Sequence, residues 1–101
     1  MTILGRIKRT VLAGQFAFSE KARIEMLANG LLEQDIVEAI ANASGINKTL
    51  RSTSPYRRGR ETLYVIISPN MQGLRIYTKG KFVEEDGVET YYFFISSKCS
   101  Q

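Results

Sequence analysis

The stretch Leu74–Ser96, LRIYTKGKFVEEDGVETYYFFIS, decides the fold class of this chain. Two runs rich in β-branched and aromatic residues flank Asp86-Gly87, a dipeptide typical of the two-residue turn in a β-hairpin. We therefore predict antiparallel strands over Leu74–Glu84 and Val88–Ser96. The second contains Tyr91–Ile95, which is apolar at every position and so typical of a central strand covered on both faces. Its aromatic residues are expected in the sheet core.

Two further strands are predicted before this hairpin. Glu61–Ser68 alternates and is rich in β-branched residues, and Ile46–Ser52 has a strand-like pattern with basic residues. The intervening segment, residues 52–59, contains Pro55 and is predicted to be a loop. Gly80 is expected to mark a β-bulge.

The residues before Gly45 have helical periodicity. Apolar side chains recur at three- and four-residue spacing, which predicts helices over Ile3–Ala13, Glu20–Ala28 and Leu32–Ala43. Ser19 is a good N-cap for the second helix, and Gln15–Phe18 is expected to be a short extended link. Helices followed by hairpin-linked strands indicate an α+β domain. Three N-terminal helices should pack on a mostly antiparallel sheet of about four strands.

The 101-residue length fits a single domain over the whole chain. No stretch reaches the roughly 18 apolar residues that a membrane span requires, and the N-terminus lacks the apolar core of a secretory signal. The single cysteine, Cys99, cannot form a disulfide within the chain, so a reducing cytoplasm is the expected setting. Cys99 is expected to be an incidental thiol, because the chain has no histidine to activate it.

Positive charge is concentrated in one segment. The chain has a formal charge of +4, with 14 basic and 10 acidic residues. Eight of the basic residues and only one acid, Glu61, lie between Ile46 and Phe82, which gives that segment +7 and the remainder −3. Such a surface attracts polyanions through its long-range field and through counterion release. RNA is therefore the expected target.

The composition also excludes several kinds of active site. Without histidine the chain can form neither a serine triad nor a histidine-ligated metal site. One cysteine is too few for a zinc finger or an iron–sulfur cluster, and no glycine-rich phosphate loop precedes a helix. We expect neither a metal nor a cofactor.

The remaining residue types can still cleave RNA. Attack of a ribose 2′-hydroxyl on the adjacent phosphate needs a proton acceptor, a proton donor and positive charge at the transition state. The candidate catalytic residues are Lys48, Glu61, Arg75 and Lys98. For Glu61, a role as an ion-pair partner is favoured over a catalytic one. The candidate RNA-binding residues, which include the aromatic and arginines of a loop suited to phosphate and base contacts, are Arg51, Tyr56, Arg57, Arg58, Arg60, Lys79 and Lys81. The alternative for that loop is ordinary solvent exposure.

The order of a helix, Ala13-Gly14-Gln15, Phe18-Ser19, two helices and a basic sheet resembles the motility quorum-sensing regulator toxins. These are a branch related to the RelE-like bacterial mRNA interferases. The chain is also similar to a broader family of small uncharacterised domains with a Phe-Ser-x-x-Ala helix start, here Phe18–Ala22. The resemblance covers about Arg6 to Lys98. It implies a RelE-like fold and a metal-independent mRNA endoribonuclease toxin. Its implied partners are RNA, free or as ribosome-bound mRNA, and a cognate antitoxin protein.

By position, the resemblance places two family lysines at Lys48 and Lys98, and Leu74-Arg75-Ile76 matches a Leu-Lys-Ile pattern. Two positions depart from the family. Glu61 stands near a strand glutamine, and Gly73 stands where the family has a tyrosine, which Tyr64 or Tyr77 would have to replace as an acid or a base-stacking group. Tyr77 is therefore added to the catalytic candidates.

Two other functions stay open. The basic sheet could bind RNA or DNA without cleaving it, or it could dock an acidic protein. All of these functions require the basic residues from Lys48 to Lys98 to share one surface.

Overall fold

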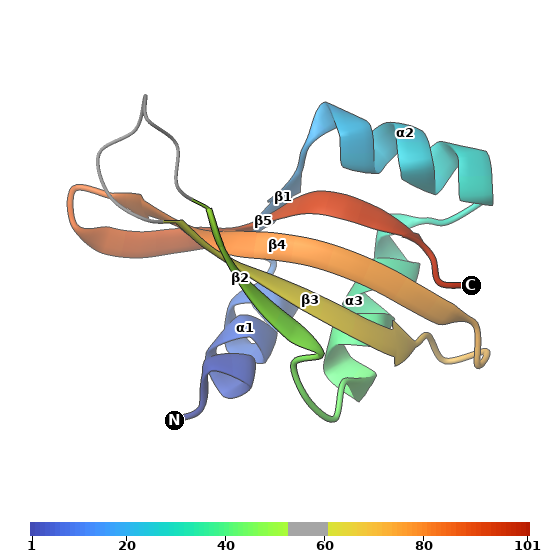
Figure 1. The fold of residues 1–101 in the computed structure, drawn as a ribbon, viewed down its shortest axis with the longest axis horizontal. Helices are drawn as coiled ribbons and strands as arrows, with labels where there is room; N and C mark the ends of the chain where they lie inside the picture. The colour runs from blue at the N-terminus through green and yellow to red at the C-terminus, as the bar shows by residue number, and fades with distance from the viewer. Residues whose placement is uncertain (53–60) are drawn as a thin grey trace.

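The computed structural model describes residues 1–52 and 61–101 (Figure 1). Within these ranges the elements, in chain order, are α1 (Ile3–Leu12), β1 (Phe16–Phe18), α2 (Glu20–Asn29), α3 (Glu33–Asn42), β2 (Lys48–Ser52), β3 (Glu61–Pro69), β4 (Arg75–Glu85) and β5 (Val88–Cys99). The α+β class with three N-terminal helices is confirmed, and so is the mostly antiparallel sheet. No helix of the described residues is long and apolar enough to cross a membrane.

The sheet has five described strands in the order β1-β5-β4-β3-β2. All neighbours are antiparallel except β1 and β5, which pair in parallel from Phe16 opposite Tyr92 to Phe18 opposite Phe94. The expectation of about four strands was therefore one short. The segment predicted as an extended link is a strand, and its three residues are too few to show a period-2 pattern.

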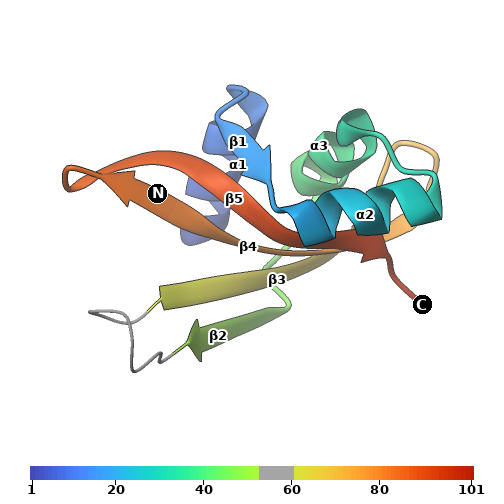
Figure 2. The ribbon, with the colours of Figure 1, turned by 90° about the horizontal axis from the view of Figure 1, so that it is seen from above.

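The helices occupy one face and one edge of the sheet. Figures 1 and 2 show α1 and α3 against the same face, whereas α2 runs level with the sheet beside β5. The core between helices and sheet contains Ile7, Ile36, Ile40, Ile66, Ile76, Tyr92 and Phe94, which are at most 1% exposed. Among the described residues no helix covers the opposite side of the sheet, which we call the open face.

The residues at the N-caps determine where α2 and α3 begin. The Ser19 hydroxyl accepts a hydrogen bond from the Ala22 N–H, which confirms Ser19 as the N-cap of α2. Leu32, predicted as the first residue of the third helix, lies just before it and is 71% exposed. The reason is that α3 begins at Glu33, so Leu32 is its N-cap and points away from the stripe formed by Ile36 and Ile40.

The β4–β5 hairpin turns at Asp86 and Gly87, whose φ angles of 54° and 78° suit a two-residue turn with positive φ at both positions. The predicted bulge is present at the Lys79–Gly80 step of β4. The extra residue lies on the partner strand, because Lys79 is opposite Ser96 and Gly80 is opposite Phe94, which leaves Ile95 unpaired.

Gly80 is required by close packing. A Cβ built at this position would lie 2.4 Å from Cε2 of Tyr92, a ring that is itself fully buried. We expect Gly80→Ala to lower the free energy of unfolding by about 1–3 kcal/mol, because a buried ring has to move. Urea denaturation measures the loss. Gly45→Ala, where no atom lies within 4 Å of the added methyl, is the control and should change stability little. Equal effects of the two substitutions would contradict this packing.

Tyr92 also makes stability depend on pH. Burial, with a smaller contribution from Tyr64, raises the pKa of Tyr92 above its ordinary value of 10.0. As pH rises above about 10 this phenol ionises in the unfolded chain but not in the folded one, so the free energy of unfolding falls. Tyr92→Phe should lose this part of the alkaline destabilisation, as seen by urea denaturation at pH 8 and pH 11. The same dependence in both proteins would contradict the prediction.

Candidate nucleic-acid interface

Four cations and one tyrosine gather on the open face. Arg75, Tyr77 and Lys79 alternate along β4 with the buried residues Ile76 and Thr78, so they point away from the helices. Lys98 joins them from the neighbouring strand β5, and Lys48 joins them from β2, on the far side of β3, as described below. We call Lys48, Arg75, Tyr77, Lys79 and Lys98 the cationic cluster.

Lys98 lies next to Tyr77. The two residues are directly opposite each other in the β4–β5 ladder, and the Lys98 Nζ is 5.4 Å from the centre of the Tyr77 ring. This distance is within the range of a cation–π interaction. The ammonium group is thereby held over an aromatic surface, while the Lys98 side chain remains 47% exposed.

The bulge at Ile95 puts Lys98 on this face. Phe94 points into the core, and uninterrupted alternation would send Ser96 and Lys98 to the same side. Because one residue of β5 is left unpaired, the alternation shifts by one position and Lys98 comes to lie beside Tyr77.

Lys48 and Lys79 lie on either side of Val65. Each is directly opposite Val65, in β2 and β4 respectively, so all three side chains share the open face. Two strand spacings separate the Cα atoms of Lys48 and Lys79 by about 10 Å. Val65 is only 5% exposed although it lies outside the main core cluster. The structure therefore brings the predicted Lys48, Arg75, Tyr77, Lys79 and Lys98 together.

Lys81 follows Lys79 by two residues on β4, so strand alternation places it on the same side, where it pairs with Glu61. Their side chains form an ion pair of 2.8 Å beyond the last β3–β4 pair, Tyr64 with Gly80. They line a cavity of about 500 Å³ between the two strands, which also contains the ion pair of Arg6 with Glu89. The ion pair expected of Glu61 is therefore present, with Lys81 as its partner. Along β3, Glu61 is four residues from Val65, or about 13 Å.

Two candidates face the other way. Arg51 is opposite Thr62, so it points to the helix side of the sheet and away from Lys48. Tyr64 is 8% exposed and belongs to the core, where it packs edge-on against Phe82. Tyr77, rather than Tyr64, is thus the tyrosine beside the cations. The predicted RNA-binding residues Tyr56, Arg57, Arg58 and Arg60 lie outside the described residues.

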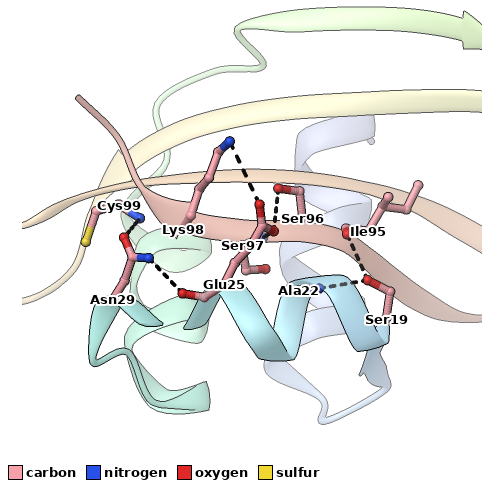
Figure 3. A network of polar contacts seen from close by, with 9 residues as sticks. All are labelled: Ser19, Ala22, Glu25, Asn29, Ile95, Ser96, Ser97, Lys98 and Cys99. Atoms are coloured by element: carbon pink, nitrogen blue, oxygen red, sulfur yellow. Dashed lines mark hydrogen bonds and ion pairs between the residues drawn. The ribbon is translucent and has the colours of Figure 1, made fainter. Parts of the chain in front are cut away.

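Helix α2 covers the edge of β5 next to Lys98 (Figure 3). After β1 ends at Phe18, side chains of α2 and its cap take over as partners of β5. The Ser19 hydroxyl donates to the Ile95 carbonyl oxygen at 2.8 Å. The Asn29 Oδ1 accepts from the Cys99 N–H at 3.0 Å. An edge strand needs such partners, because its outward N–H and C=O groups would otherwise be unpaired.

Glu25 is the acidic member of this edge contact. Its Oε1 accepts from the Ser96 hydroxyl at 2.8 Å and from the Ser97 N–H at 3.2 Å. Its Oε2 lies 3.8 Å from the Lys98 Nζ. Sequence analysis did not select Glu25, because its partners are more than 70 positions away in the chain and no local pattern marks it.

A cavity of about 530 Å³ opens beside this contact. It is lined by Asn29, Tyr77, Lys98, Cys99, Ser100 and Gln101. Cys99 is half-buried with its side chain against the core. The cavity adds a recess next to Tyr77 and Lys98, large enough for part of a ligand that contacts both.

The cluster can bind and polarise anions. Its cations can neutralise phosphate oxygens, and the Tyr77 phenol and Lys98 ammonium can donate protons. Among residues 1–52 and 61–101, no three potential metal ligands gather in one place. No protein-family model, curated protein or solved structure matches the chain. Function is therefore argued from this geometry.

The edge contact itself can be tested at Ser19. Ser19→Ala removes the cap of α2 and the bond to Ile95, and we expect it to lower the free energy of unfolding by about 2 kcal/mol. Thr2→Ala is the matched control, because Thr2 caps α1 through the Gly5 N–H and makes no bond to the sheet. Chemical denaturation of both variants gives the comparison. An equal loss in both would mean that the Ser19–Ile95 bond adds nothing.

Proposed function

We propose that the open face binds RNA and that the cationic cluster cleaves it. The protein would then act as a metal-independent mRNA endoribonuclease in a bacterial cytoplasm, as a toxin restrained by a cognate antitoxin. The observation that carries this proposal is the convergence of Lys48, Arg75, Tyr77, Lys79 and Lys98 on one helix-free face. The sequence resemblance described above supplies the toxin context.

Charge supports the binding part of the proposal. Lys48, Arg75 and Lys79 have no ion-pair partner among the described residues, so their charges are available to a phosphate chain. Of the described acids, Glu25 is the one that pairs with a member of the cluster, and its partner there is Lys98. Cations spread over β2, β4 and β5 suit successive phosphates of a single strand better than one compact anion.

Cleavage would use the 2′-hydroxyl of the substrate. The 2′-hydroxyl would pass its proton to a solvent water as its oxygen forms a bond to phosphorus. The bond from phosphorus to the 5′-oxygen would break, and the products would carry a 2′,3′-cyclic phosphate and a 5′-hydroxyl. Arg75 and Lys79 would stabilise the negative charge of the transition state. Lys98 or Tyr77 would donate the proton to the departing 5′-oxygen.

A non-catalytic nucleic-acid-binding module is the second candidate. It is favoured by the position of Glu61, the candidate proton acceptor, which is paired with Lys81 and about 13 Å along β3 from the row that contains Lys48 and Lys79. In that case the open face would hold RNA without a base to activate the 2′-hydroxyl.

Single substitutions separate these functions. In EDTA, Lys98→Ala and Arg75→Ala should each slow cleavage of purified single-stranded RNA by about 100-fold, because each removes a charge from the transition state. Lys48→Ala should mainly weaken binding and reduce the salt slope of log K by about one. Arg51→Ala is the control, since Arg51 lies on the other face. Growth arrest on induced expression should likewise require Lys98.

Three outcomes would decide against parts of the proposal. Salt-dependent binding without product would support the non-catalytic module. Absence of RNA binding at physiological salt would remove both candidates and leave docking of an acidic protein. An effect of Arg51→Ala as large as that of Arg75→Ala would show that the open face is not the site.

A further inference from the structure

Among the described residues, Glu25 is the one acid that forms an ion pair with the cationic cluster, and hydrogen bonds from β5 hold it in place. Glu25 is only 17% exposed, and two donors of β5, the Ser96 hydroxyl and the Ser97 N–H, share its Oε1. A carboxylate with two hydrogen bonds to one strand cannot swing toward solvent without breaking both. Its second oxygen, Oε2, is directed at Lys98, with 3.8 Å to the Nζ.

Lys98 is thereby confined between two groups. Glu25 attracts the ammonium from the edge of β5, and the Tyr77 ring lies under it with 5.4 Å between Nζ and ring centre. A lysine side chain has about 2 kcal/mol of rotamer entropy, so an exposed lysine without such neighbours samples many positions. No comparable pair of contacts fixes Lys48 or Lys79 within the described residues.

We propose that Glu25 is a positioning residue, which fixes the Lys98 ammonium at the place where the cleaved phosphate is bound. This inference rests on the proposed ribonuclease function. Glu25 acts through Lys98 and transfers no proton itself. A cation that is already in place does not have to move when negative charge develops in the transition state. Its preorganisation therefore lowers the activation free energy. The same carboxylate repels phosphate, so Glu25 should weaken RNA binding while it speeds cleavage.

Glu25→Gln tests these opposite effects. Glutamine keeps an oxygen for Ser96 and Ser97 but lacks the charge that attracts Lys98. We expect kcat to fall about tenfold while RNA affinity stays equal or rises by up to about fivefold at low salt. The melting temperature should stay within about 4 °C of the wild type. A purely structural role would instead lower stability, affinity and kcat together.

Two controls isolate the contact with Lys98. Glu33→Gln makes the same charge change in an exposed pair with Arg23, on another helix, and should leave kcat unchanged. In a Lys98→Ala background, Glu25→Gln should have no further effect on kcat, because the residue through which Glu25 acts is gone. An equal loss of kcat with and without Lys98 would overturn the proposal.

A measurement without RNA separates this inference from the proposed function. NMR relaxation at the Lys98 Cε should give a lower order parameter in Glu25→Gln than in the wild type, with Lys79 unchanged. Glu25→Asp, which withdraws the carboxylate by one methylene, should show the same loss. Unchanged order at Lys98 would overturn the positioning role. Lower order at Lys98 together with no RNA cleavage by the wild type would overturn the ribonuclease function but keep the positioning role.

Discussion

The backbone N–H and C=O groups on the outer edge of β5 need hydrogen-bond partners. The elements that provide these partners determine where β1 and α2 lie. β1 supplies partners for only three residues, up to Phe18 opposite Phe94. From Ser19 onward the side chains of α2 replace a strand, through Ser19, Glu25 and Asn29. Because α2 is used along this edge, it lies level with the sheet, and the open face beside it stays uncovered.

Paired charges and unpaired cations lie in different parts of the sheet. Around the gap between β3 and β4, acids and bases are paired, as in Lys81 with Glu61 and Arg6 with Glu89. Within the cationic cluster, Lys98 is the one member that has an ion-pair partner among the described residues. Paired charges contribute little field at a distance, whereas the fields of neighbouring cations on the open face add to one another.

Local sequence signals were sufficient for the fold class and for the described elements other than β1. The Asp86-Gly87 turn, the Ser19 cap and the bulge near Gly80 follow from the conformations that these residues favour, and each was found where predicted. β1 was missed because its stability comes from pairing with Tyr92–Phe94, far along the chain, and not from its own pattern. Arg51 and Tyr64 were misplaced because the residue types of a strand do not show which of its two faces the helices cover.

The sequence alone determined the fold class, the strands that carry the positive charge and the exclusion of histidine chemistry, since all of these depend on residue type and short spacing. Only the tertiary structure decided which charges share a face. A single unpaired residue, Ile95, reverses the alternation of β5 and moves Lys98 to the side of Tyr77. The contact of Glu25 with Lys98 likewise exists only because α2 docks against a strand 70 residues later. Register and docking are properties of the folded chain, because they are set by pairing between distant segments.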